Sequence, residues 1–182
     1  METVSIYPLA TLRLSLRRRL YEAQLEAARV WTRCRDLHLA ARQRHTRWPD
    51  RDALQQATKG QFALHSQTVQ MVCHQFLAKV ETARELRQTN RQIRYPYKDK
   101  RFFPLYWPAQ AVSVERGRIV LPMGRGRPSL VFKLDLPERI GGASWCGRTA
   151  MSCRSRCRSV PLRRLRGRSR LPLTWERSIR RR

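Results

Sequence analysis

A run of alternating cations and aromatic rings occupies residues 94–103, with the sequence RYPYKDKRFF. Aromatic rings stack on bases and basic side chains pair with phosphates, so this alternation is typical of nucleic-acid contact. Pro96 favours an extended backbone that leaves side chains accessible. The alternative is that the rings fill the core and the cations form a solvated face. We predict contacts from Arg94, Tyr95, Tyr97, Lys98, Lys100 and Arg101.

A second candidate contact is the glycine–arginine linker Gly124-Arg125-Gly126-Arg127. Glycine residues let the backbone approach a phosphate closely, and the two arginines supply the charge. We therefore add Arg125 and Arg127 to the predicted nucleic-acid contacts.

No set of residues suited to catalysis can be assembled from the sequence. Metal-dependent nucleases need several converging carboxylates, and acid–base enzymes need a poised pair. Acids that are close in sequence are Glu22 and Glu26, Asp50 and Asp52, and Glu81 and Glu85. The glutamates lie four residues apart among arginines, a spacing typical of a salt-bridged helix surface. We predict no catalytic residues.

Three cysteines near the C-terminal end could be read as zinc ligands. Six residues lie between Cys146 and Cys153 and three between Cys153 and Cys157, so the usual close pair is missing, and no fourth ligand follows. The four histidines also lack neighbouring ligands at metal spacing. We therefore predict no metal site and no cofactor for this chain.

The overall charge indicates a polyanionic partner. The 182 residues carry a net charge of +26, and each cation placed on a phosphate releases condensed counterions. Nucleic acid is the first interpretation and an anionic membrane surface is the lesser one. No apolar stretch is long enough to cross a bilayer, and the first eleven residues lack the pattern of a signal peptide. We expect a cytoplasmic protein with reduced thiols, no membrane partner and no small-molecule substrate.

The spacing of apolar residues predicts a mixed α+β fold. β-branched and aromatic residues predict a strand over Glu2–Leu9. Apolar residues at intervals of three and four predict helices over Leu12–His45, Arg51–Thr58 and Ser66–Gln88. Asp50 and Ser66 are placed to cap the last two helices. Three short strands are expected to form a meander: Ala111–Glu115, Arg118–Pro122 and Ser129–Leu134.

Four phrases in order resemble the N-terminal half of the transposon-encoded TnpB/OrfB proteins. They are Ala28–Trp31 (ARVW), Leu64–Gln70 (LHSQTVQ), Arg94–Lys98 (RYPYK) and Val114–Leu121 (VERGRIVL). That family contains compact RNA-guided DNA endonucleases. The resemblance implies a β-barrel "wedge" interrupted by a helical recognition unit, which together bind guide RNA and double-stranded DNA. It also implies a RuvC-like nuclease domain with a divalent metal and a zinc ribbon, and we find neither in this sequence.

The composition changes abruptly after Gly142. Residues 143–182 hold 13 arginines, no lysine and one acid, Glu176. This charge repels itself and no apolar period accompanies it, so we predict a disordered basic tail.

A shifted reading frame accounts for the tail. When the frame is shifted to begin on the third base of each codon, the codons of Trp145 (TGG) and Cys146 (TG and a third base) overlap as GTG, which encodes valine. Permitted codons over residues 144–153 spell Val-Val-Trp-Lys-Asp-Gly-Tyr-Glu-Leu, a strand–turn–strand pattern. Those over residues 171–180 allow Ala-Val-Asp-Leu-Gly-Glu-Ile-His-Gln, which resembles the family's first RuvC-like motif. We interpret the tail as out of frame, through loss of one base or gain of two near Gly142.

The sequence thus predicts four segments. Residues 1–11 form the first strand of an incomplete wedge-like barrel, 12–90 a helical recognition-like unit, 91–142 the rest of the β unit, and 143–182 the tail. The predicted function is binding of RNA and DNA without cleavage. The alternative is a stand-alone basic nucleic-acid-binding protein with a selected arginine-rich tail. A third outcome is that an incomplete barrel exposes its edges and misfolds.

Overall fold

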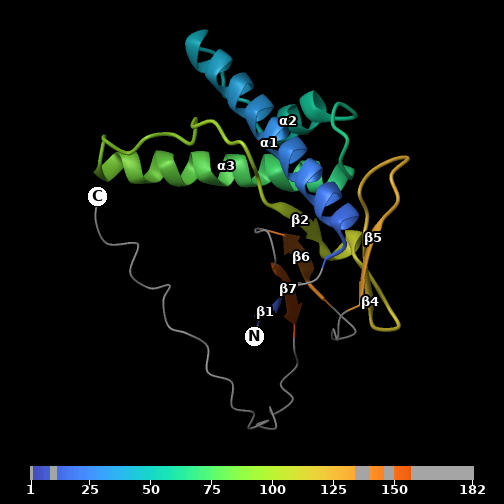
Figure 1. The fold of residues 1–182 in the computed structure, drawn as a ribbon. Coiled ribbons are helices and arrows are strands. Elements are labelled where there is room, and N and C mark those ends of the chain that lie inside the picture. The colour runs from blue at the N-terminus through green and yellow to red at the C-terminus, as the bar shows by residue number, and fades with distance from the viewer. Residues whose placement is uncertain (1, 9–11, 134–139, 146–149, 157–182) are drawn as a thin grey trace.

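Three helices pack beside two small sheets (Figure 1). The structure is a computed structural model that describes residues 2–8, 12–133, 140–145 and 150–156, without the side chains of the first and last of these ranges. The mixed α+β class predicted from the sequence is confirmed.

All three predicted helices are present. Helix α1 spans Leu14–Gln43, α2 spans Arg51–Thr58 and α3 spans Ser66–Thr89. Helix α1 crosses α3, and α2 packs against α3 near its N-terminal end (Figure 1). Each helix begins and ends within two residues of its predicted bounds because its apolar positions repeat at helical spacing. No helix in the described ranges has an apolar stretch long enough to cross a bilayer.

The two predicted helix caps have different outcomes. Asp50 caps α2 as predicted, since its Oδ1 accepts a hydrogen bond from the Ala53 amide at 3.0 Å. The prediction that Ser66 caps α3 is wrong. His65 takes that position in an extended conformation, without a side-chain cap bond, and its carbonyl accepts from the Val69 amide. The helix therefore begins at Ser66 itself.

The predicted meander forms a three-stranded antiparallel sheet in the order β3-β4-β5. Its strands are β3 (Ser113–Glu115), β4 (Arg118–Leu121) and β5 (Leu130–Lys133). Arg116 and Gly117 connect β3 to β4 with φ angles of 45° and 70°, as a tight two-residue hairpin requires. Ala111 was expected in the first strand but lies in the short 3₁₀ helix η1 (Ala109–Ala111).

A second antiparallel sheet has four strands in the order β1-β7-β6-β2. They are β1 (Glu2–Pro8), β2 (Leu105–Pro108), β6 (Gly142–Trp145) and β7 (Ala150–Arg156). Strand β2 was not predicted, because its four residues are too few to show a clear period. The described strands form two open sheets rather than a closed barrel.

The prediction of a disordered tail over residues 143–182 is wrong for two segments. Residues 143–145 belong to β6 and residues 150–156 form β7. Strand β7 pairs with β1 on one side and β6 on the other, so its backbone groups are satisfied regardless of its arginines. Ala143 and Trp145 alternate onto the buried face, being 5% and 3% exposed. Cys146 and residues 157–182, which include Cys157, lie outside the described residues, as does the Cys153 side chain. The prediction that these three cysteines form no zinc site is therefore not tested.

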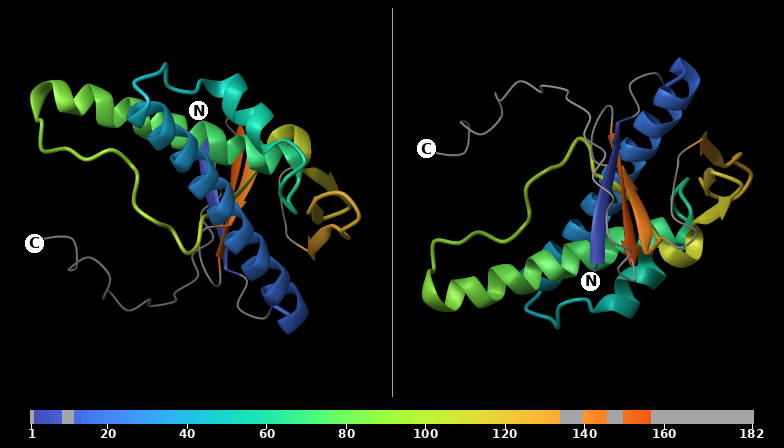
Figure 2. Two further views of the ribbon diagram at one scale, coloured as in Figure 1. Left: turned by 90° about the horizontal axis from the view of Figure 1, so that it is seen from above. Right: turned by 90° about the horizontal axis from the view of Figure 1, so that it is seen from below.

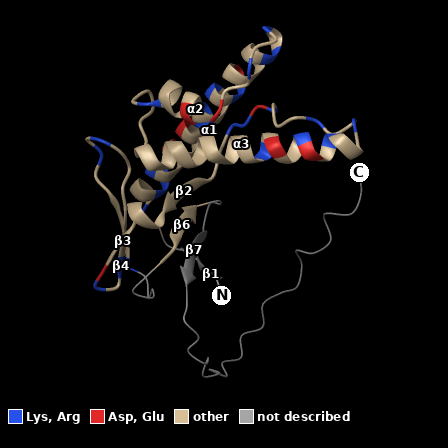
Figure 3. Ribbon diagram, turned by 180° about the vertical axis from the view of Figure 1, so that it is seen from behind, with Lys and Arg blue, Asp and Glu red and all other residues tan. Residues whose placement is uncertain are grey.

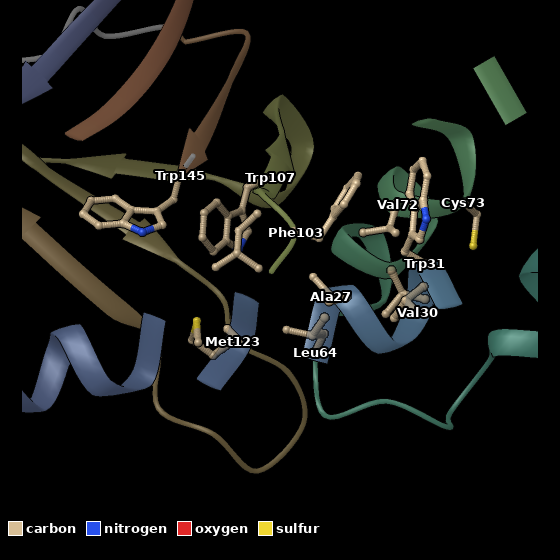
Figure 4. Close-up of a cluster of buried hydrophobic side chains, with 14 of the residues drawn as sticks. Ala27, Val30, Trp31, Leu64, Val72, Cys73, Phe103, Trp107, Met123 and Trp145 are labelled. Carbon is tan, nitrogen blue, oxygen red and sulfur yellow. The ribbon is translucent and has the colours of Figure 1, made fainter. Parts of the chain in front are cut away.

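One hydrophobic cluster connects the helices to the strands (Figure 4). Trp31 of α1 packs on two rings of the cluster, with its ring centroid 5.1 Å from that of Phe76 and 4.8 Å from that of Phe103. Trp107 and Trp145 continue the cluster into the four-stranded sheet, and the Trp107 Nε1 donates to the Pro122 carbonyl at 2.9 Å. The surface that carries the predicted contacts is thus supported by a continuous core.

Candidate nucleic-acid interface

The basic-aromatic residues lie on the chain segment that returns from α3 to the sheet, residues 91–104, which we call the return segment. It leaves the C-terminal end of α3 and passes beside that helix before it enters β2 (Figures 1 and 2). Its far end is held by the Phe103 amide, which donates to the Gln24 carbonyl at 3.2 Å. The return segment is therefore an ordered strip between α1 and α3.

Tyr95 and Tyr97 belong to an aromatic cluster. Their ring centroids are 5.6 Å apart with an interplanar angle of 26°, and the Trp48 and Tyr95 rings form a T-shaped pair with centroids 5.4 Å apart. The hydroxyl of Tyr97 lies 3.1 Å from Nδ1 of the buried His38, and burial raises the pKa of Tyr97. Both tyrosines are half-buried, so their rings contribute to packing as well as to the surface.

Two arginines that the sequence reasoning missed lie over the Tyr95 ring. The Arg42 guanidinium lies 5.8 Å from the ring centroid and that of Arg87 lies 5.2 Å away. Arg42 is in the last turn of α1, and Arg87 is in that of α3. No spacing in the sequence connects these positions with Tyr95, since the contacts depend on how the helices cross.

Three of the predicted cations are exposed on the return segment: Arg94, Lys98 and Arg101. The Arg101 guanidinium lies 5.4 Å from the centroid of the Phe102 ring. None of the three is in an ion pair with a described acid, and the one acid between them, Asp99, pairs with Arg35 of α1. These cations are consequently available to a polyanion.

The Lys100 side chain lies against the buried Trp31 ring, close to a second lysine, Lys79. Its Nζ lies 4.3 Å from the Trp31 ring centroid, and the Nζ of Lys79 lies 5.5 Å from the same centroid. Burial lowers the pKa of Lys100, and the neighbouring Lys79 charge lowers it further. Sequence reasoning missed Lys79, which is isolated from other cations along α3.

Arg125 and Arg127 lie in the loop between β4 and β5, away from the return segment. This loop borders a cavity of about 850 Å³ whose other walls are the end of α2, the first turn of α3 and the residues between them. Gly124 has a φ of 119°, and a Cβ there would be 2.9 Å from the Leu64 carbonyl carbon. Arg19 of α1 donates to the Pro128 carbonyl. The loop therefore lies against the α2–α3 connection at Gly124 and against α1 at Pro128.

The structure does not bring the two predicted groups together. Arg125 and Arg127 border the same cavity as the first residues of α3, whereas Arg94 follows the C-terminal end of that helix. A helix of 24 residues is about 36 Å long. The two groups are therefore separate basic regions on different segments, and the distance between them is greatest at Arg94, because the return segment runs back along α3 towards β2.

No protein-family model matches this chain, and the search of curated proteins gives no match either. The resemblance to TnpB/OrfB proteins thus remains a hypothesis based on the four phrases quoted above.

Several acids pair with arginines on the helix surfaces (Figure 3). Glu22 pairs with Arg18 at 3.0 Å, Glu26 with Arg29 at 2.9 Å, and Glu81 with Arg84 at 3.9 Å. Glu26 also accepts a hydrogen bond from the Ala63 amide. In the described ranges, no three His, Cys, Asp or Glu side chains gather as metal ligands.

Cys34 and Cys73 meet in the core between α1 and α3. Their sulfur atoms are 3.6 Å apart, and the Thr58 hydroxyl lies 3.6 Å from the Cys73 sulfur. Both thiols are free and fully buried. The Cys34 thiol donates to Cys73 and is desolvated, and both effects raise its pKa. This pair belongs to the packing and not to the candidate interface.

Proposed function

We propose that this protein binds RNA and double-stranded DNA through the return segment and the adjoining ends of α1 and α3. The observation that carries this proposal is the row of exposed cations at Arg94, Lys98 and Arg101, which have no described carboxylate partner. Rings lie among these cations, and Arg42 and Arg87 add charge beside Tyr95. Cations pair with phosphates, and rings present faces on which bases can stack.

The finer proposal is that the chain represents the N-terminal half of a TnpB/OrfB-type RNA-guided endonuclease and binds without cutting. Besides the four phrases, the order of elements supports it. Strand β1 precedes the three helices, and the other strands of its sheet follow them, so a helical unit interrupts one β unit. An incomplete wedge barrel around a recognition unit would have this order. Binding without cleavage follows from the lack of a carboxylate set in the sequence.

Titration of labelled RNA and DNA with the purified protein tests the binding proposal. Fluorescence anisotropy over a series of salt concentrations should give an affinity whose logarithm falls linearly with the logarithm of salt. An affinity that is unchanged by salt, or absent at low salt, would contradict it. Incubation of the protein with plasmid DNA and magnesium tests the proposal that it binds without cutting. Cleavage of the plasmid by the wild-type protein would refute that proposal.

Strands β6 and β7 favour a second candidate function. Their residues pair in register as translated, with Ala143 opposite Cys153 and Trp145 opposite Met151. This agrees better with a stand-alone basic nucleic-acid-binding protein whose C-terminal region was selected. Resequencing the gene around the Gly142 codon separates the two candidates. A single-base correction that opens a frame encoding a RuvC-like domain favours the first, and an unchanged sequence favours the second.

A further inference from the structure

Two lysine side chains from distant parts of the chain converge on one buried ring. Lys79 comes from the middle of α3 and Lys100 from the return segment, and both ammonium groups lie within cation–π distance of Trp31. Lys100 also lies 5.0 Å from the centroid of Phe103. Two ammonium groups from different segments thus lie close to the buried Trp31 ring.

No described acid neutralises this pair. The acid next to Lys100 in sequence, Asp99, pairs with Arg35, and the acid nearest to Lys79 on its helix, Glu81, pairs with Arg84. Neither lysine is in an ion pair within the described ranges. Two like charges without a counterion repel each other, so an anion that accepts hydrogen bonds from both would be favoured.

The accessibility of the two lysines suits a ligand from solution. Lys79 is exposed, and Lys100 is partly buried. The lowered pKa of Lys100 has its largest cause in burial and its second in the Lys79 charge, which agrees with two adjacent ammonium groups. A bound anion would oppose the second of these effects.

We propose that Lys79 and Lys100 form a two-lysine site for one phosphate group of a nucleic-acid backbone. Two oxygens of a phosphodiester can accept one hydrogen bond from each ammonium group. The site lies beside Lys98 and Arg101 in the chain, and would extend the interface from the return segment onto α3. This inference rests on the proposed function, and it adds Lys79 to the contacts expected from the sequence.

The first test uses inorganic phosphate as the probe and does not depend on nucleic-acid binding. The chain has five lysines, at positions 59, 79, 98, 100 and 133, so their side-chain carbon resonances can be assigned by single substitution. Replacing chloride by phosphate at constant ionic strength should shift the resonances of Lys79 and Lys100 and raise the pKa of Lys100. The resonance of Lys133, an exposed lysine on β5, should not move.

The second test measures the affinity for a short single-stranded RNA. Lys79→Gln should lower the affinity several-fold and reduce the slope of log affinity against log salt by about 0.7, the value for one phosphate contact on a single strand. The matched control, Lys133→Gln, removes the same charge elsewhere and should change both much less. Because both lysines contact one phosphate, the double variant Lys79→Gln with Lys100→Gln should lose less affinity than the two single losses combined.

Each outcome decides a different point. If phosphate moves neither lysine resonance, the two-lysine site is refuted. If phosphate moves both but Lys79→Gln behaves like Lys133→Gln with RNA, the site binds free anions and its nucleic-acid role is refuted. If the wild-type protein binds neither RNA nor DNA, the proposed function fails, and the phosphate titration still decides whether the site exists. Lys79→Arg keeps the charge and should retain most of the affinity for RNA. If Lys79 had a purely structural role, Lys79→Gln would lower the melting temperature of the protein instead of its affinity.

Discussion

The Tyr97 hydroxyl oxygen lies 3.1 Å from Nδ1 of His38, and this pair connects the return segment to the interior of α1. His38 is only 1% exposed and its ring packs against Trp48, Phe76 and Tyr97. Burial lowers the pKa of His38. The position of the predicted nucleic-acid contacts is therefore linked to a buried histidine whose pKa is lowered by its burial.

The first prediction concerns acid destabilisation. An unfolded histidine takes up a proton near pH 6.5, whereas the folded His38 does so only at lower pH. The unfolded state thus binds more protons, and the free energy of unfolding should fall as the pH drops from about 7.5 to 5.5. Urea unfolding followed by circular dichroism should show a smaller fall for His38→Gln. Part of the fall should remain, because burial also lowers the pKa of His65 and His74.

The control for this experiment is His45→Asn. His45 is exposed and has a φ of 53°, a left-handed conformation that asparagine tolerates. This variant should keep the pH dependence of the wild type. An identical dependence in His38→Gln would mean that another group causes the acid destabilisation.

A second prediction concerns the cap of α2. Asp50→Ala removes the side-chain acceptor of the Ala53 amide and should lower the free energy of unfolding by about 1 kcal/mol. Hydrogen exchange should show the loss first at the α2 amides, because a helix of eight residues depends strongly on its cap. Asp52→Ala removes an acid from the same first turn without removing the cap, and should cost less. If the two substitutions lowered the free energy of unfolding equally, Asp50 would stabilise α2 through its charge alone and not through the cap hydrogen bond.

A third prediction compares two glycines in the loop that carries Arg125 and Arg127. Gly124→Ala should destabilise the protein by more than about 1 kcal/mol, because its φ is 119° and the new Cβ would be 2.9 Å from the Leu64 backbone. Gly126→Ala also has a positive φ, of 73°, but no atom within 4 Å of its Cβ, so it should cost less. Thermal melting of both variants measures the difference. A smaller loss for Gly124→Ala would show that this loop does not pack against the α2–α3 connection.

A fourth prediction concerns β6 and β7. Deleting the chain from Gly142 onward removes both strands that lie between β1 and β2, and should lower the melting temperature. Trp145→Ala, which leaves the chain length unchanged, should cost about 3 kcal/mol because the side chain is 3% exposed. A truncated chain that melts cooperatively at the wild-type temperature would show that these strands do not stabilise the fold.

A fifth prediction separates the two basic regions. Replacing Arg94, Lys98 and Arg101 by glutamine should reduce the salt slope for single-stranded RNA by about 2, at about 0.7 per phosphate contact. Replacing Arg125 and Arg127 should reduce it by about 1.4. The free-energy losses should add, because Arg125 and Arg127 lie beside the α2–α3 connection and the other three cations lie on the return segment. Anisotropy titrations at several salt concentrations give both quantities, and loss of affinity from only one set would limit the interface to that region.

Several features could be predicted because they depend on residues close in sequence. The helices follow from apolar residues at intervals of three and four, such as Ala27, Val30, Trp31 and Cys34, all of which are buried. The hairpin between β3 and β4 follows from Arg116-Gly117, whose φ angles match a two-residue turn. Asp50 was recognised as a cap from its position before α2.

The errors arise where a segment depends on distant partners. Ala143–Trp145 and β7 looked irregular because of their arginines and serines, yet pairing with β2 and β1 makes them strands. Strand β2 was missed for the same reason, since its alternation of Leu105 and Trp107 covers only four residues. Backbone hydrogen bonds between strands depend on a partner and its register, which local composition does not report.

The sequence by itself determined the charge of the chain and the three helices, and it supplied the list of predicted contact residues. Only the tertiary structure decided which of those residues lie together. It separates Arg125 and Arg127 from the return segment, buries part of Tyr95 and Tyr97, and adds Lys79 beside Lys100. The physical reason is that local periodicity sets which face of a helix is buried, whereas the crossing of α1 over α3 sets which exposed side chains meet.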